Sequence, residues 1–95
     1  MTSAGSGRIR VITVAGTNTI TGGGFPGITA YDVWKEYIMR PVGSNSGPVT
    51  INVDSVGARA LKTPNGSALS GGELTSAQDI AFYDDGSVFV IVGPF

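Results

Sequence analysis

Apolar and polar residues alternate in several short stretches of the chain, most clearly at residues 49–54, where the sequence is VTINVD. This two-residue period places one face of a β-strand in a core and the other face in water. The alternation resumes after Gly57, in ARALKT at residues 58–63. We therefore expect two short strands hinged at a glycine, with PNG at residues 64–66 as the next turn.

Strands are also expected nearer the N-terminus. Residues 8–15 (RIRVITVA) alternate, with Ile9 and Val11 on one face and Arg8 and Arg10 on the other. A second short strand is expected at residues 18–21 (NTIT). Residues 33–41 alternate as well, and their more apolar face contains Val33, Lys35, Tyr37 and Met39.

The C-terminal part of the chain predicts a hairpin. Residues 78–83 and 87–92 flank the sequence DDG at residues 84–86. An Asp-Gly pair between two β-rich runs is a strong hairpin signal, because the glycine can take the positive φ that the turn needs. Residues 88–92 are apolar throughout, which predicts a strand that is covered on both faces.

Glycine and proline at residues 22–27 (GGGFPG) are expected to interrupt regular structure and form a wide turn that folds Phe25 back onto the sheet. A phosphate-binding loop is the alternative interpretation. That loop would need the lysine and hydroxyl residue of a Walker A sequence, which this stretch lacks. Nucleotide binding is therefore not expected.

Composition narrows the fold class to all-β. Fifteen glycines describe a turn-rich chain, and the many Val, Ile, Thr, Phe and Tyr residues favour strands. We predict a small antiparallel β-sandwich or barrel with an extended N-terminal arm. Residues 1–10 would form the arm and residues 11–95 a single β domain.

Charge limits the partners that the chain can attract. Six basic and seven acidic residues give a net charge of −1, which does not favour nucleic acid or an anionic membrane. No apolar run approaches the roughly 20 residues that span a bilayer. Only 14% of the residues are charged, so sheet edges would be poorly protected, which favours a homo-oligomer.

The residues that could carry chemistry do not form a catalytic pattern. Without histidine or cysteine, the chain lacks the commonest metal ligand, thiolate ligands and the usual general base. Asp84 and Asp85 could bind calcium or act as a carboxylate pair, with Asp54, Asp79 and Glu73 as further candidates. No D-x-D-x-D-G series is present, and turn chemistry explains the two aspartates better. We expect no enzyme, no cofactor and no metal site.

Arginines and aromatic residues are the remaining candidates for a binding surface. Two alternatives are weighed: a basic patch of four arginines, or single arginines on solvated strand faces. Those arginines are Arg8, Arg10, Arg40 and Arg59. Tyr31, Trp34 and Tyr37 could form a stacking platform, but packing is the better interpretation for Tyr37 and a subunit interface for Trp34, which is flanked by charge.

Several short motifs recur together in a known kind of module. The motifs are NTIT at 18–21, GITAY at 27–31, SGPVTINV at 46–53, GARAL at 57–61, PNGSAL at 64–69 and YDDG at 83–86. In order and spacing they resemble a small module that is common in tail-fibre and other virion structural proteins of tailed bacteriophages. The resemblance covers about residues 18 to 93.

The resemblance implies a non-enzymatic, β-rich and often trimeric building block of a virion. Two features depart from it: the bulky residues 33–37 replace a glycine-containing turn, and the module is nearly the whole chain rather than part of a long fibre. No site residue of the family carries over.

From the motifs and the arm together, we expect a capsid decoration or cement subunit, made in the host cytoplasm and located on the virion. It would form a homo-oligomer, expected to be a trimer, and bind capsid or tail subunits. Residues 1–10, with Arg8 and Arg10, would clamp a neighbour at a sheet edge, and Phe25, Trp34 and Phe95 would be apolar anchors. The alternative is a tail-fibre or tail-tip module that binds a host receptor or glycan.

Overall fold

Seven short strands make up the regular structure in a computed structural model that describes residues 9–24 and 27–94. They are β1 (Ile9–Ala15), β2 (Thr19–Gly23), β3 (Glu36–Met39), β4 (Val49–Val53), β5 (Ala58–Lys62), β6 (Ile80–Asp84) and β7 (Phe89–Pro94). Within these described ranges there is no helix. The predicted all-β class is confirmed.

The strands close into a barrel in the order β1-β2-β4-β5-β7-β6-β3, so each strand has a neighbour on both sides. β1–β2, β4–β5, β6–β7 and β3–β6 are antiparallel. β1–β3, β2–β4 and β5–β7 are parallel, so the sheet is mixed rather than wholly antiparallel. The three antiparallel hairpins have short turns, whereas the parallel pairs join segments that lie farther apart in the chain, where no turn sets the strand direction.

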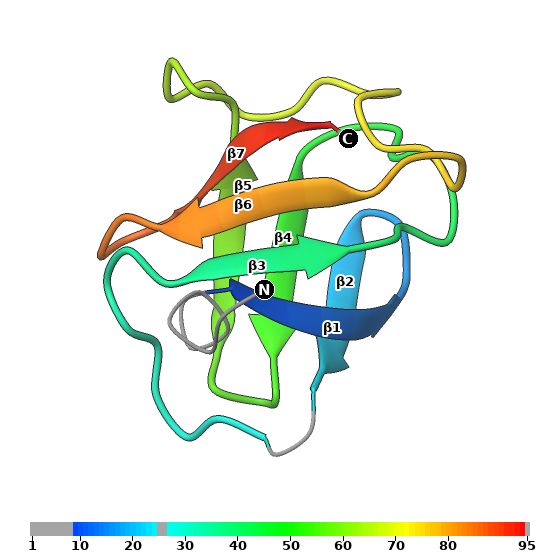
Figure 1. The fold of residues 1–95 in the computed structure, drawn as a ribbon. Helices are drawn as coiled ribbons and strands as arrows, with labels where there is room; N and C mark the ends of the chain where they lie inside the picture. The colour runs from blue at the N-terminus through cyan, green and yellow to red at the C-terminus, as the bar shows by residue number, and fades with distance from the viewer. Residues whose placement is uncertain (1–8, 25–26, 95) are drawn as a thin grey trace.

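Two layers of strands enclose the core. β1, β3, β6 and β7 lie side by side across the front of Figure 1, and β2, β4 and β5 cross behind them at a steep angle. Residues 27–35, which lead into β3, pass around the lower left of the barrel in this view. The long connection thus places the residues just before β3 at one end of the front layer.

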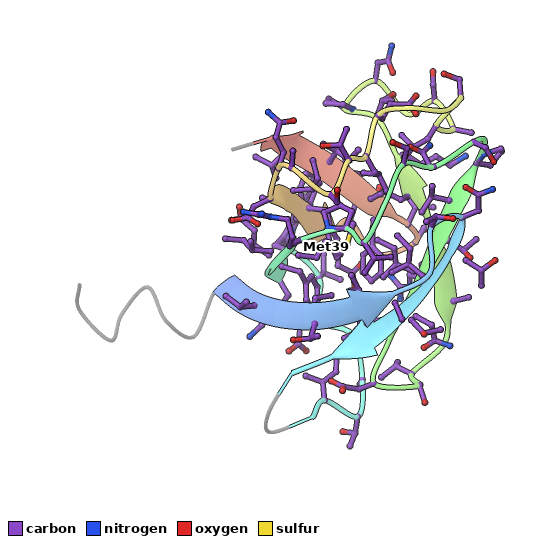
Figure 2. The ribbon with its side chains drawn as sticks, turned by 90° about the vertical axis from the view of Figure 1, so that its right-hand side faces the viewer. Met39 is labelled. Carbon is purple, nitrogen blue, oxygen red and sulfur yellow. The ribbon has the colours of Figure 1, made fainter. Side chains whose placement is uncertain are left out.

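Aromatic side chains fill the centre of the barrel. Tyr37 of β3 stacks on Phe82 of β6 with ring centroids 5.2 Å apart, and Phe89 of β7 packs against both rings at 5.6 and 5.0 Å. All three are fully buried, as is Met39, which is labelled among the interior side chains in Figure 2. Packing is confirmed as the role of Tyr37.

The β4–β5 hairpin matches the sequence prediction closely. Val49, Ile51 and Val53 of β4 are buried, and β5 pairs with β4 from Ala58 to Leu61. The β6–β7 hairpin is also confirmed, with Gly86 in its turn at a φ of 104°. Short-range alternation and turn chemistry were sufficient for both hairpins.

β1 turns the face that carries Ile12 and Val14 into the core and leaves Val11 71% exposed. The sequence analysis placed Ile9 and Val11 on the same face of this strand. In the structure, Val11 lies on the outer face of the barrel. The run VITV is apolar on both faces, so its alternation could not decide which side is buried. Ile9 and Arg10, assigned to the arm from sequence, are the first two residues of β1.

β2 continues into the glycine run, which was expected to interrupt regular structure. Gly22 and Gly23 are its last two residues and pair with β1. A Cβ at Gly22 would collide with the backbone oxygen of Thr13, and one at Gly23 would collide with the carboxylate of Asp54. The absence of a side chain at these two positions of β2 therefore lets the backbone of β1 and the side chain of Asp54 lie close to the strand.

Candidate functional site

Trp34 lies in an exposed turn at residues 32–35, just before β3, which we name the Trp34 turn. The Lys35 amide donates to the Asp32 carbonyl over 3.1 Å, and the Trp34 amide donates to the Asp84 carbonyl over 2.6 Å. Trp34 has a φ of 71°, a strained value for a bulky residue. The backbone is therefore held in place against its local preference.

The indole of Trp34 stacks on the ring of Tyr83, with centroids 5.6 Å apart and an angle of 27° between the planes. Trp34 is nevertheless 69% exposed, and its neighbour Val33 is 54% exposed. Tyr83 thus supports one face of the indole while much of the side chain remains open to a partner. An apolar side chain held in this way is typical of interaction surfaces.

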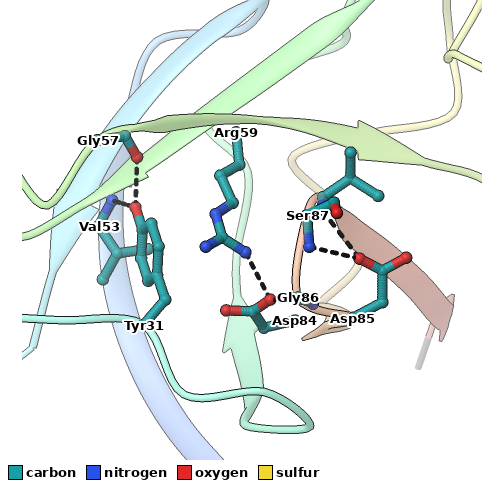
Figure 3. A network of polar contacts seen from close by, with 9 residues as sticks. Tyr31, Val53, Gly57, Arg59, Asp84, Asp85, Gly86 and Ser87 are labelled. Atoms are coloured by element: carbon teal, nitrogen blue, oxygen red, sulfur yellow. Dashed lines mark hydrogen bonds and ion pairs between the residues drawn. The ribbon is translucent and has the colours of Figure 1, made fainter.

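A polar network beneath the Trp34 turn joins it to two hairpins. The Tyr31 hydroxyl donates to the carbonyl of Gly57 over 2.5 Å and accepts from the amide of Val53 over 2.9 Å. Figure 3 shows Arg59 between Tyr31 and Asp84, with its guanidinium carbon 4.7 Å from the centroid of the Tyr31 ring. Arg59 Nη1 and Asp84 Oδ1 form an ion pair at 2.6 Å.

Asp84 is the most deeply buried acid of the described residues, at 0% exposure. Its Oδ1 also accepts from the Gly86 amide over 2.7 Å, whereas Oδ2 is buried and has no hydrogen-bond partner. Burial is also the main cause that raises the pKa of Tyr31 above its ordinary value. The network therefore joins the Trp34 turn to the β4–β5 and β6–β7 hairpins.

Asp85 has the turn role that was expected from sequence. Its Oδ1 accepts from the amides of Ser87 and Val88, each over 2.9 Å. These hydrogen bonds, that from Val88 first, lower the pKa of Asp85. Among the described residues no three Asp or Glu side chains form a group that could hold a metal ion.

A groove between β1 and β3 forms a second exposed surface, with a volume of about 560 Å³. Val11 and Ile38 are direct partners in the β1–β3 pairing, and both line the groove together with Val42. At its rim, Arg40 Nε and Asp79 Oδ1 form an ion pair at 2.5 Å, and this contact raises the pKa of Arg40. We call this surface the β1–β3 groove.

The structure brings together some of the candidate residues and separates others. Trp34 is exposed, as an interface residue must be. Arg40 and Arg59 each pair with their own carboxylate, so these two arginines do not form a shared basic patch. Arg10 pairs its backbone with Tyr37 within the barrel. Arg8, Phe25 and Phe95 lie outside the described residues, so their interface role stays a prediction.

Sequence reasoning missed the β1–β3 groove and the Arg59–Asp84 pair. The groove depends on which face of β1 is turned outward and on the parallel pairing with β3, neither of which is visible in the alternation. Arg59 and Asp84 are separated by 25 residues in the chain. Because the two residues lie in different hairpins, no local sequence pattern links them.

Comparison with protein families found no family model that matches the chain, and comparison with curated proteins found no match. In the part of the chain that the structure describes, no helix is long and apolar enough to cross a membrane.

Proposed function

We propose that this protein is a non-enzymatic structural protein of a tailed-phage virion. In this proposal it is a self-associating β module on the particle surface, where it acts as a capsid decoration or cement subunit. It forms a homo-oligomer, expected to be a trimer, and binds capsid or tail subunits. The proposal rests on the surface of the barrel and on the resemblance of the motifs at residues 18–93.

The observation that carries the proposal is the exposure of large apolar side chains on a closed barrel. They are Val11, Val33, Trp34, Val42 and Val92, all at least 49% exposed. By contrast, the buried polar side chains of the described residues, Asn45 and Asp84, are engaged in contacts that hold loops and turns. Exposed apolar surface on a closed barrel supports a role in association.

Closure of the barrel changes how association would occur. Every strand already has two neighbours, so a partner would meet side chains on the outer face more readily than an open edge. The arm remains part of the proposal as a further source of contacts. The proposed assembly therefore uses exposed side chains together with the arm.

The test is to measure binding of the purified protein to particles of the encoding phage that lack it. We expect saturable cosedimentation of the full chain with these particles and weaker cosedimentation after deletion of residues 1–7. Deletion of this segment leaves the described strands complete, so the shortened protein is expected to fold. Thermal unfolding of both proteins is the control that checks this. Equal binding by both proteins would contradict the role of the arm, and absence of binding by the full chain would contradict the proposed function.

A receptor- or glycan-binding module of a tail fibre or tail tip is the second candidate. The exposed indole that is backed by Tyr83 favours it, because aromatic rings on loops stack on sugar rings and other flat ligands. A glycan array with the purified protein and with a Trp34→Ala variant tests this function. Glycan binding that is lost in the variant would favour the second candidate over the first.

A further inference from the structure

We infer that Asn65 is a site of spontaneous deamidation, in which Gly66 supplies the attacking nitrogen and the Thr63 hydroxyl promotes the reaction. The site is the turn at residues 63–67, which follows β5 and contains none of the exposed apolar residues that carry the proposed function. The inference is independent of that function, because it rests on the chemistry of this turn alone.

The turn presents its asparagine to solvent. Asn65 and Gly66 are both exposed, as are their neighbours Pro64 and Ser67. Two backbone hydrogen bonds close the turn, from the Gly66 amide to the Thr63 carbonyl over 2.8 Å and from the Thr63 amide to the Ser67 carbonyl over 2.9 Å. Gly66 has a φ of 90°, and a Cβ at this position would meet no atom within 4 Å. Water and base can therefore reach the peptide bond between Asn65 and Gly66.

The side-chain amide of Asn65 is polarised by the same turn. The Thr63 hydroxyl donates a hydrogen bond to Asn65 Oδ1 and accepts one from the Ser67 amide over 3.1 Å. Negative charge develops on Oδ1 when a nucleophile adds to the amide carbon, and a donor placed at that oxygen stabilises this charge. The Thr63 hydroxyl therefore lowers the barrier to attack on this amide.

The reaction needs only water and base. The Gly66 nitrogen loses its proton to base, once its hydrogen bond to Thr63 has opened, and attacks Cγ of Asn65 within the same chain. A bond forms between this nitrogen and Cγ, the bond from Cγ to Nδ2 breaks, and Nδ2 leaves as ammonia with a proton from solvent. The resulting succinimide ring adds water and opens to aspartate or isoaspartate. Because the first step removes an amide proton, the rate should rise with pH.

The other three asparagines of the chain lack this combination. Asn18 and Asn52 each precede a β-branched residue, whose stiff side chain hinders the approach of its amide nitrogen. Asn45 is 3% exposed, and its side-chain amide donates to the Gly47 carbonyl and to the Glu73 carboxylate. These three residues are therefore internal controls for the reaction.

The modification would change the turn in two ways. Either product adds a negative charge to a chain whose net charge is −1. Isoaspartate also routes the main chain through the former side chain, which adds a carbon atom between Asn65 and Gly66. That atom would disturb the hydrogen bond from Gly66 to the Thr63 carbonyl and the bridge between Lys62 and Ala68. The isoaspartate form should therefore be the less stable product.

The experiment follows the full chain by mass spectrometry during incubation at neutral and mildly alkaline pH. Trypsin cuts after Lys62, and the peptide 63–95 that it releases has Asn65 as its only asparagine. Fragmentation of this peptide locates the conversion of amide to acid, and enzymatic methylation detects isoaspartate. In protein that is folded by thermal unfolding, we expect Asn65 to react roughly 10-fold faster than any other asparagine.

Two variants at residue 63 test the role of the hydroxyl. Thr63→Val removes it with little change of shape, and Thr63→Ser keeps it. In the folded state we expect Thr63→Val to deamidate roughly 5-fold more slowly than wild type, the rate equivalent of one ordinary hydrogen bond, and Thr63→Ser to match wild type. In urea, where the turn is not formed, all three proteins should react at the same rate.

Three outcomes would contradict the inference. Reaction of Asn65 no faster than that of the other asparagines would overturn the site, as would cleavage of the chain after residue 65 in place of deamidation. Equal or faster reaction of Thr63→Val in the folded state would overturn the role of the hydroxyl. The measurement needs no particle, so failure of the proposed function would leave its result unchanged.

Discussion

Asp84 illustrates how one residue joins two turns and a strand of this barrel. Its side chain pairs with Arg59 of β5 and accepts from Gly86 in the β6–β7 turn. Its backbone carbonyl accepts from Trp34, and its amide donates to the Lys35 carbonyl. The backbone of Asp84 therefore holds the turn that carries the exposed indole, while its buried carboxylate holds Arg59 and the β6–β7 turn.

Replacing Arg59 with methionine is expected to destabilise the fold by about 3 kcal/mol, because it leaves the buried Asp84 carboxylate without its counter-charge. The side chain of Arg59 is 24% exposed, and we therefore expect the lower end of the range for buried pairs. Urea unfolding of the variant measures the loss. The double variant Arg59→Met with Asp84→Asn should lose less than the two single variants together, and strict additivity would contradict the coupling.

Gly22 provides a second prediction at the residue scale. Gly22→Ala should cost about 1–3 kcal/mol, because its Cβ would collide with the backbone oxygen of Thr13 in the neighbouring strand. Gly47→Ala is the matched control, since a Cβ there meets no atom within 4 Å, and it should change stability by less than about 0.5 kcal/mol. Equal urea midpoints for both variants would show that β1 and β2 can move apart without loss of stability.

At the scale of elements, loops without regular structure are held by side chains. Asn45, which is buried, accepts from the Leu74 amide over 3.0 Å and donates to Glu73 Oε1 over 3.0 Å. Glu73 in turn accepts from the amides of Ser70 and Gly71, each over 2.8 Å. This pair clips the loop after β3 to the loop before β6.

The Glu73 clip predicts a pH dependence of stability. The hydrogen bonds from Ser70, Asn45 and Gly71 lower the pKa of Glu73 from 4.5 to about 2. Because the unfolded chain binds the proton more readily, the contribution of Glu73 is complete above about pH 4.5 and is lost as the pH falls toward 2. Urea unfolding measures the free energy of unfolding of wild type and of Glu73→Gln across this window. The difference in favour of wild type should shrink as the pH falls. A difference that does not change with pH would count against the clip.

On the scale of the whole molecule, closure of the barrel depends on one short ladder. β5 and β7 pair only at Leu61 with Phe89 and at Lys62 with Val90, whereas β6 and β7 pair along five positions. The remaining ladders have three or four pairs each. The β5–β7 pairing, which we call the seam, therefore has the fewest paired residues of any two neighbouring strands in the barrel.

Local opening should begin at that seam. We expect amides that bridge β5 and β7 to exchange with solvent hydrogen faster than amides that bridge β4 and β5, because fewer hydrogen bonds must break together. Hydrogen exchange followed by NMR resolves the two sets. Uniform exchange of both sets would mean that the barrel opens only by global unfolding.

Much of the local structure could be predicted from the sequence. Alternation at residues 49–54 located the buried face of β4, and the Asp-Gly pair located the β6–β7 turn. Trp34 was expected at a surface, and it is exposed. The arm and the phage role stay predictions. These successes share a cause, since strand alternation and turn preferences act between residues that are close along the chain.

The all-β class, most of the strands and the turn chemistry were thus determined by the sequence alone. Only the tertiary structure decided the parallel pairing of β1 with β3, the outward face of Val11 and the meeting of Arg59 with Asp84. Each of these depends on contacts between distant segments, whose energies reflect packing of the whole core rather than any local preference. The β1–β3 groove and the exposed position of the Trp34 turn follow from that packing.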